Sequence, residues 1–135
     1  FAQTQSDVQS EHVYFTSRVL EGTQRGRFLL LSECGGFSCR VEGHTAQERK
    51  NYCYGQPART GGELTGKIQA LYDDMVLPSI PKGLCGCVYT QLSDVEGETN
   101  GLYTYDRQVR KASAGAMTDI AARAAEALAR SVKTG

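Results

Sequence analysis

The sequence contains no tryptophan, only two histidines and three prolines, and no excess of charge of either sign. Fifteen lysines and arginines balance fifteen aspartates and glutamates, so the chain has no overall field that would attract nucleic acid or an anionic membrane. We therefore expect no nucleic-acid partner. No apolar run approaches the roughly 20 residues of a membrane-spanning helix, so no membrane span is predicted.

Motifs for metal ions and cofactors are also missing. Structural zinc sites space their cysteine ligands two to four residues apart in two pairs, and neither Cys34 with Cys39 nor Cys85 with Cys87 fits that pattern well. The thiol-redox motif Cys-x-x-Cys is absent. The sequence thus predicts no metal and no cofactor.

The chain does have five cysteines in 135 residues: Cys34, Cys39, Cys53, Cys85 and Cys87. Cysteine at this density in a small domain indicates disulfide cross-links and an oxidising compartment, so the predicted location is secreted or periplasmic. Phe1-Ala2 in place of a methionine fits an N-terminus from which an export signal was cleaved.

The spacing of the cysteines predicts which of them do not pair. A tight turn at Gly35-Gly36 would leave Cys34 and Cys39 as diagonal neighbours about 7 to 8 Å apart, too far for a relaxed disulfide. Cys85 and Cys87 would be neighbours on one face of a single strand. Bridges are therefore expected to join Cys34, Cys39 or Cys53 to the strand of Cys85 and Cys87, with one cysteine left over and the connectivity open.

Five strands are predicted from alternating or short apolar runs. They span residues 11–20, 27–34, 37–42, 84–92 and 102–109. The most apolar run, Phe28 to Leu31, predicts the central strand. Gly35-Gly36 and Asn100-Gly101 are typical of hairpin turns, which would make neighbouring strands antiparallel.

Two amphipathic helices are predicted, over residues 60–77 and 113–133. Thr60 and Glu63 have the capping-box spacing, and Pro78 predicts that the first helix ends at Leu77. The predicted fold is α+β, with order βββαββα: a five-stranded, mainly antiparallel sheet, disulfide cross-linked, with both helices on one face. Residues 1–10 are expected to form a flexible arm and 11–135 a single domain.

Seven tyrosines carry the strongest functional signal. Tyr52 and Tyr54 flank Cys53 in a long polar loop, and binding surfaces favour tyrosine because it offers a large area at modest entropy cost. Three tyrosines of predicted strands extend this candidate surface: Tyr89, Tyr103 and Tyr105. The sequence thus predicts an exported binding module, an inhibitor or accessory subunit, that contacts another protein through the Cys53 loop. Its oligomeric state is left open.

A small secreted hydrolase, such as a ribonuclease, is the alternative. His12 and His44 are the two side chains that titrate near neutral pH and could act as general base and general acid. Arg40 could contact the phosphate. This alternative requires His12, His44 and Arg40 to converge.

Overall fold

Three parallel strands form the sheet in the computed structural model, which describes residues 5–22, 26–47 and 52–133. The strands are β1 (Val8–Val13), β2 (Phe28–Gly35) and β3 (Leu84–Thr90), and they lie in the order β1-β2-β3. The prediction that the most apolar run forms the central strand is therefore confirmed. β1 begins at Val8, inside the segment expected to be an arm.

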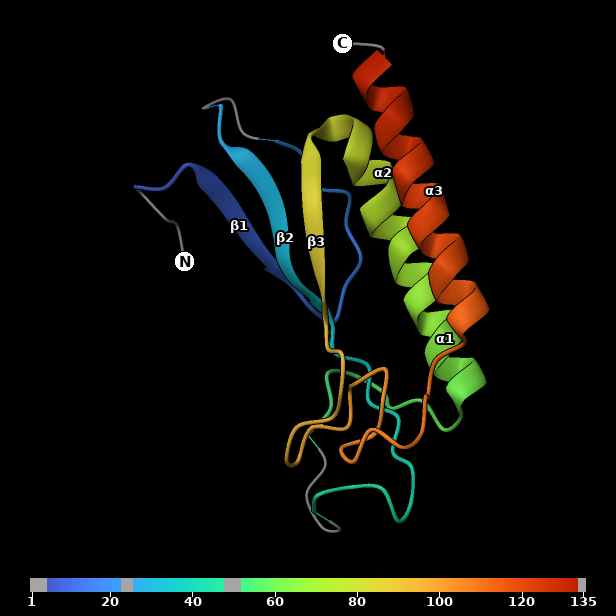
Figure 1. Ribbon diagram of the computed structural model, residues 1–135. Helices are drawn as coiled ribbons and strands as arrows, with labels where there is room; N and C mark the ends of the chain where they lie inside the picture. The colour runs from blue at the N-terminus through green and yellow to red at the C-terminus, as the bar shows by residue number, and fades with distance from the viewer. Residues whose placement is uncertain (1–4, 23–25, 48–51, 134–135) are drawn as a thin grey trace.

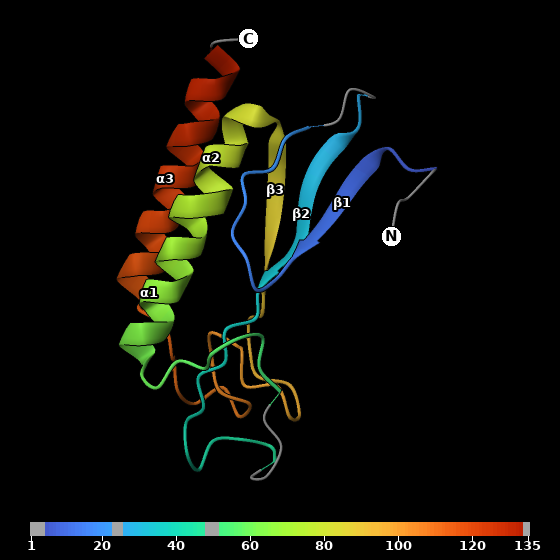
Figure 2. The same ribbon diagram turned by 180° about the vertical axis from the view of Figure 1, so that it is seen from behind.

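The helices lie together on one side of the sheet (Figures 1 and 2). They are α1 (Gly61–Leu71), the single turn α2 (Leu77–Ser79) and the long α3 (Ala114–Lys133). Both predicted helices thus form. Among the described residues, no helix has the length and apolar character needed to cross a membrane.

The start of α1 is set by the predicted capping box. The Thr60 hydroxyl accepts a hydrogen bond from the Glu63 amide at 3.1 Å, and the Glu63 carboxylate accepts one from the Arg59 amide at 2.8 Å. The first bond satisfies a helix amide that has no partner within the helix, and the second holds the residue that precedes the N-cap. The local sequence was sufficient to place this helix end.

Pro78 does not end the helix, which contradicts the prediction. A π-helical turn, Tyr72–Val76, precedes α2, and the Leu77 amide bonds to the Tyr72 carbonyl five residues back. Proline normally clashes with the carbonyl four residues earlier, and the wider turn gives that region more room. The helical path therefore continues through α2 and a short 3₁₀ turn, Ile80–Lys82, to Gly83, whose φ is +104°.

Two apolar clusters form the core. The first fills the space between the sheet and the α1–α2 segment: Val13, Leu20, Leu29, Leu31, Cys34, Leu71, Met75, Val76 and Leu84. The second joins α1 and α3 to the loops: Cys39, Ala58, Leu64, Ile68, Ala112 and Ile120. The connection from β1 to β2 belongs to the first cluster, because Leu20 is buried and its amide donates to the Ser79 hydroxyl at 2.8 Å.

The predicted five-stranded antiparallel sheet is wrong. Residues 37–42 and 102–109 form loops with isolated bridges, not strands. Gly35 and Gly36 do have positive φ, at +89° and +68°, but the chain leaves the sheet after them and forms no hairpin. The hairpin prediction assumed that strands close in sequence pair with each other, whereas β2 and β3 are joined through α1.

The predicted disulfide cross-links are also wrong, because Cys34, Cys39, Cys53, Cys85 and Cys87 are all free. In the parallel register Cys34 lies opposite Tyr89, and Cys87 lies opposite Leu31. Burial raises the pKa of the Cys34 thiol to about 12. Free cysteines do not support a secreted or periplasmic location, which stays a prediction.

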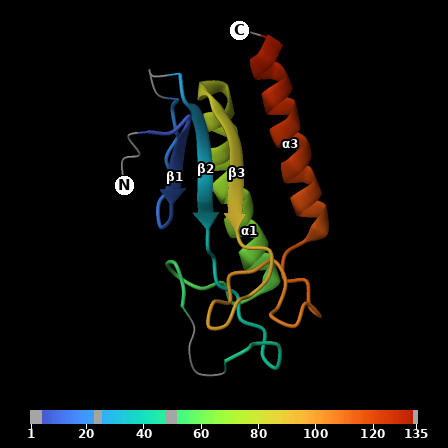
Figure 3. The same ribbon diagram turned by 60° about the vertical axis from the view of Figure 1, so that its left-hand side comes forward.

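Below the carboxyl ends of the strands, three segments form a layer without helices or extended strands (Figure 3). We call this the loop layer, and it comprises residues 36–47, 52–60 and 91–113. In open sheets with parallel strands, ligands bind beyond the carboxyl ends of the strands. The loop layer and the strand ends above it are therefore the place to look for a functional site.

Candidate functional site

A hydrogen-bonded cluster joins the carboxyl ends of all three strands. The Tyr14 hydroxyl, just after β1, donates to Glu33 Oε2 of β2 at 2.7 Å. Because its one proton is used there, the Thr90 hydroxyl of β3 donates to the Tyr14 oxygen, at 3.1 Å. His12 Nδ1 lies 3.4 Å from the same Glu33 oxygen. Burial raises the pKa of Tyr14, so its phenol stays protonated and serves as a hydrogen-bond donor.

Four aromatic rings gather at this point, and we call them the aromatic cluster: Tyr14, Phe15, Tyr52 and Tyr54. Tyr14 and Tyr54 stack, with ring centroids 4.2 Å apart and planes 13° apart. Tyr52 meets Tyr54 edge-on at 5.0 Å, and Phe15 meets it at 5.6 Å. Phe15 is 71% exposed and Tyr52 is 54% exposed, so the outer rings of the cluster face solvent.

Glycine is required where β2 ends beside these rings. A Cβ atom on Gly36 would lie 2.6 Å from the Tyr54 ring and 3.1 Å from the Tyr14 ring, and one on Gly35 would lie 2.3 Å from Tyr89. Both glycines also have positive φ, which other residues rarely adopt. The Gly35-Gly36 pair thus allows aromatic rings to close on the backbone instead of making a hairpin turn.

A cavity of about 290 Å³ lies beneath the aromatic cluster. Tyr14, Tyr54 and Phe37 line it, and Lys67 and Leu71 of α1 contribute its other side. The Lys67 ammonium lies 5.7 Å from the centroid of the Phe37 ring, within the range of a cation–π contact. The strand ends therefore carry both an exposed aromatic surface and a recess next to it.

The other predicted tyrosines do not join this cluster. Tyr89 packs against both core clusters. Tyr103 forms bridges to Ser93 and Arg110 in the loop layer, and Tyr105 is 45% exposed in a turn nearby. No ring contact of these three tyrosines occurs among the described residues. Of the five predicted binding tyrosines, the structure brings together Tyr52 and Tyr54.

The two histidines bind different carboxylates. His12 lies by Glu33, whereas His44 Nδ1 lies 2.7 Å from Asp106 Oδ2 in the loop layer. Arg40 lines a separate pocket with Arg59. The three residues of the hydrolase alternative are thus found in three different settings, and no described contact links them.

Sequence reasoning missed Tyr14, Phe15 and Thr90. Each follows or ends a strand, and strands read as antiparallel would place these residues at opposite edges of the sheet. Had the strands been read as parallel, their carboxyl ends would have been expected at one edge. The long connections between the strands, which are not hairpins, were the feature of the sequence that could have indicated parallel strands.

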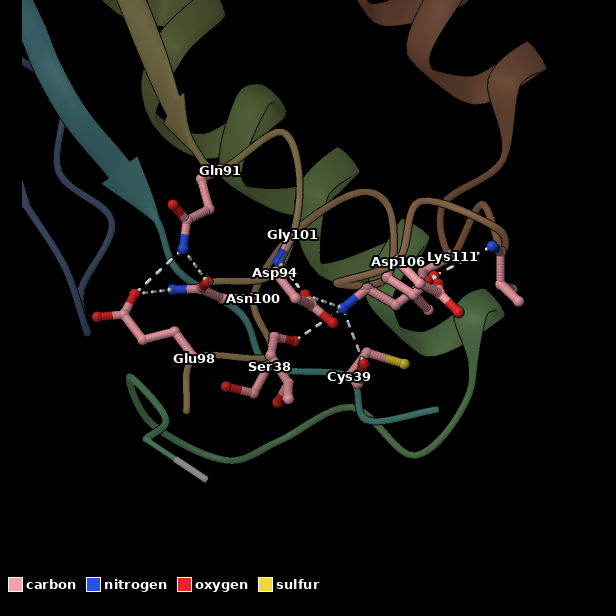
Figure 4. Close-up of polar contacts among 12 residues, drawn as sticks. Ser38, Cys39, Gln91, Asp94, Glu98, Asn100, Gly101, Asp106 and Lys111 are labelled. Carbon is pink, nitrogen blue, oxygen red and sulfur yellow. Dashed lines mark hydrogen bonds and ion pairs between the residues drawn. The ribbon is translucent and has the colours of Figure 1, made fainter. Parts of the chain in front are cut away.

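A buried ion pair holds the loop layer together (Figure 4). The Lys111 ammonium donates to Asp94 Oδ1 at 2.6 Å and to the carbonyls of Cys39 and Thr99, each at 2.9 Å. The side chain of Lys111 is fully buried and that of Asp94 is 1% exposed. A lysine has three donors, and all three are used here. One charge therefore binds the segments 36–47 and 91–113 of the loop layer to each other.

A polar network lies beside this pair. The Gln91 amide donates to Asn100 Oδ1 at 2.7 Å, and both amides donate to the Glu98 carboxylate at 3.2 Å (Figure 4). Tyr52 connects to this network, because its amide donates to the Gly97 carbonyl at 3.0 Å. The network therefore supports the backbone that carries the aromatic cluster.

Asp106 is stabilised as a carboxylate, which predicts a pH dependence. Bonds from the Thr104 hydroxyl and from His44 lower the pKa of Asp106 to about 2. A carboxyl group with a lowered pKa contributes stability above its ordinary pKa and loses it as the pH falls through the folded value. Asp106→Asn should therefore destabilise the protein near neutral pH, and the difference from wild type should shrink between about pH 4 and pH 2.

Urea unfolding at a series of pH values measures this difference. Asp74→Asn is the control, because Asp74 is exposed and makes no hydrogen bond or ion pair among the described residues. If the difference in free energy of unfolding between Asp106→Asn and wild type stayed constant down to pH 2, the lowered pKa of Asp106 would be contradicted.

No group of three or more potential metal-ligating side chains occurs among the described residues. Compared with models of known protein families and with curated proteins, the sequence matches none of them.

Proposed function

We propose that this protein is a binding module that contacts a partner protein through the aromatic cluster. The observation that supports this most is Phe15. It is 71% exposed although its φ is +66°, a conformation that is costly for a bulky residue. The free protein gains no stability from a strained backbone that holds a large apolar ring in water. Such strain concentrates at functional positions.

The neighbouring rings favour protein recognition. The rings of Phe15 and Tyr52 each contact Tyr54, which also stacks on Tyr14. Rigid aromatic side chains lose little entropy on binding and are enriched among the residues that dominate interface energies. The cluster is thus organised before a partner arrives.

The hydrolase alternative has less support. It needs general acid and base groups at one substrate, and His12 and His44 contact Glu33 and Asp106 respectively. An aromatic binding surface requires no such convergence.

Alanine substitution in the cluster tests the proposal. Phe15→Ala and Tyr52→Ala should each weaken partner binding about tenfold or more, as loss of a central aromatic contact costs roughly 1 to 2 kcal/mol or more. Proteins captured from an extract of the source cell by the immobilised wild-type chain would be identified by mass spectrometry, and their affinities for each variant measured.

Tyr105→Ala is the matched control, because Tyr105 is 45% exposed but lies outside the cluster. It should bind as wild type does. If Phe15→Ala and Tyr52→Ala bound every captured protein as tightly as Tyr105→Ala, the aromatic cluster would not be the binding surface.

A further inference from the structure

A second pocket, of about 360 Å³, opens in the loop layer away from the recess under the aromatic cluster. Ser38 and Arg40 from the loop after β2 line one part of it, Cys53 and Arg59 another, and Thr99 the third. Among the described residues, none lines both this pocket and the recess that Tyr14 and Lys67 line. It is therefore a separate site.

The charged side chains among the described lining residues of this pocket are basic. Arg40 and Arg59 are both exposed and both line it, and none of the described residues that line it is acidic. Arg59 forms no side-chain hydrogen bond or ion pair among the residues that the structure describes. Two guanidinium groups match the charge of a phosphate dianion, and their planar donors suit its oxygens.

The buried wall of the pocket adds an independent observation. Thr99 is 2% exposed, and within the described part of the chain its hydroxyl has no hydrogen-bond partner. Buried hydroxyls without partners are rare, and an ion or a water bound beside Thr99 would satisfy this one. Ser38, also 2% exposed, is different because its hydroxyl donates to the Tyr52 carbonyl at 2.9 Å.

The position of Thr99 is held firmly. Its carbonyl accepts from the Cys39 amide at 2.8 Å and from the Lys111 ammonium at 2.9 Å. The buried ion pair of the loop layer therefore sets the distance between Thr99 and the segment of Ser38 and Arg40. A pocket organised in this way needs little rearrangement to bind a ligand.

We propose that this pocket binds the phosphate group of a small molecule, either free phosphate or a phosphate monoester. Arg40 and Arg59 supply the positive charge, and the Thr99 hydroxyl donates to a phosphate oxygen. The proposal is independent of the protein-binding function of the aromatic cluster. No chemical step is assigned to Cys53, whose thiol donates to the Gly55 carbonyl at 2.9 Å.

Cys53 provides a built-in reporter for the test. It lines the pocket and is partly exposed, whereas Cys85 is exposed on β3 and lines a different cavity. Alkylation of the native protein by iodoacetamide, followed by peptide mass spectrometry, measures the rate at each cysteine. Inorganic phosphate or phenyl phosphate should slow alkylation of Cys53 several-fold and leave Cys85 unchanged, with sodium chloride used to keep the ionic strength equal.

Variants test whether the protection of Cys53 from alkylation depends on this pocket. Arg59→Gln should raise the concentration needed for half-protection about tenfold, as loss of a charge-assisted contact predicts. Thr99→Val, which replaces the hydroxyl with a methyl group of similar size, should raise this concentration less. Arg110→Gln is the control, because Arg110 is exposed and does not line the pocket. Circular dichroism would verify that each variant is folded.

The two ligands separate the two sources of the phosphate group. Stronger protection by phenyl phosphate indicates a monoester, and stronger protection by inorganic phosphate indicates the free anion. Equal rates at Cys53 with phosphate and with chloride would overturn the proposal. So would protection that is the same in Arg59→Gln as in Arg110→Gln. Neither result would bear on Phe15→Ala, so this site and the aromatic cluster can fail separately.

Discussion

Lys111→Met is expected to lower the free energy of unfolding by about 3 to 5 kcal/mol, because it leaves the Asp94 carboxylate buried without its counter-ion. The lysine side chain is fully buried and donates to Asp94 and to two carbonyls, so the substitution also leaves those acceptors with one partner fewer. Domains of this size are stable by only about 5 to 15 kcal/mol. Urea unfolding followed by circular dichroism measures the loss.

The double variant Asp94→Asn/Lys111→Met distinguishes the unpaired charge from the lost packing. Asparagine keeps an acceptor for the Gly101 amide, which donates to Asp94 Oδ1 at 2.8 Å, but it carries no charge. The double variant should therefore be more stable than Lys111→Met alone. Equal stability of the two variants would show that the charge of Asp94 is not the cause.

The destabilisation caused by Lys111→Met should depend on pH. Burial raises the pKa of Asp94, and removal of the lysine takes away the group that opposes this rise. A carboxyl whose folded pKa is raised destabilises the protein at high pH and ceases to do so as it becomes protonated. The deficit of Lys111→Met relative to wild type should accordingly be smaller under acidic conditions than at neutral pH.

Gly101→Ala should destabilise the protein by about 3 kcal/mol or more, at or above the upper end of typical overpacking effects. A Cβ atom at Gly101 would lie 2.3 Å from both the Asp94 amide nitrogen and the Ser93 carbonyl carbon. These are backbone atoms in the segment that bears the buried ion pair, so they cannot move aside as a flexible side chain could. The loop layer would have to shift as a unit.

Gly66→Ala is the matched control, and its effect on the stability of the protein should have the opposite sign. Gly66 lies within α1, and a Cβ atom there would meet nothing within 4 Å. Alanine in place of glycine inside a helix stabilises by roughly 0.5 to 1 kcal/mol. Thermal unfolding of the two variants measures both effects, and a Gly101→Ala protein as stable as wild type would contradict the packing described for the loop layer.

The candidate sites were only partly predictable. Tyr52 and Tyr54 stood out because they flank Cys53, and Arg40 was singled out as a cation for phosphate. Phe15 lies within the predicted strand 11–20, yet it is among the most exposed aromatic side chains described. Its exposure results from a positive φ after the end of β1, which no residue preference would indicate for phenylalanine.

Local chemistry determined several features of this protein from the sequence alone. The capping residues Thr60 and Glu63 set the start of α1, the apolar stripe predicted α3, and the run from Phe28 to Leu31 marked the central strand. Each of these depends on contacts within a few residues, or on the average burial of a segment. Such features leave a direct pattern in the sequence.

The direction of the strands and the state of the cysteines were decided by the tertiary structure. Whether β2 pairs parallel or antiparallel with β3 depends on where α1 carries the chain, which the residues at Gly35-Gly36 do not encode. That choice placed Cys34 opposite Tyr89 and left the cysteines unpaired. It also brought the ends of β1, β2 and β3 to one edge, where the aromatic cluster and the loop layer meet.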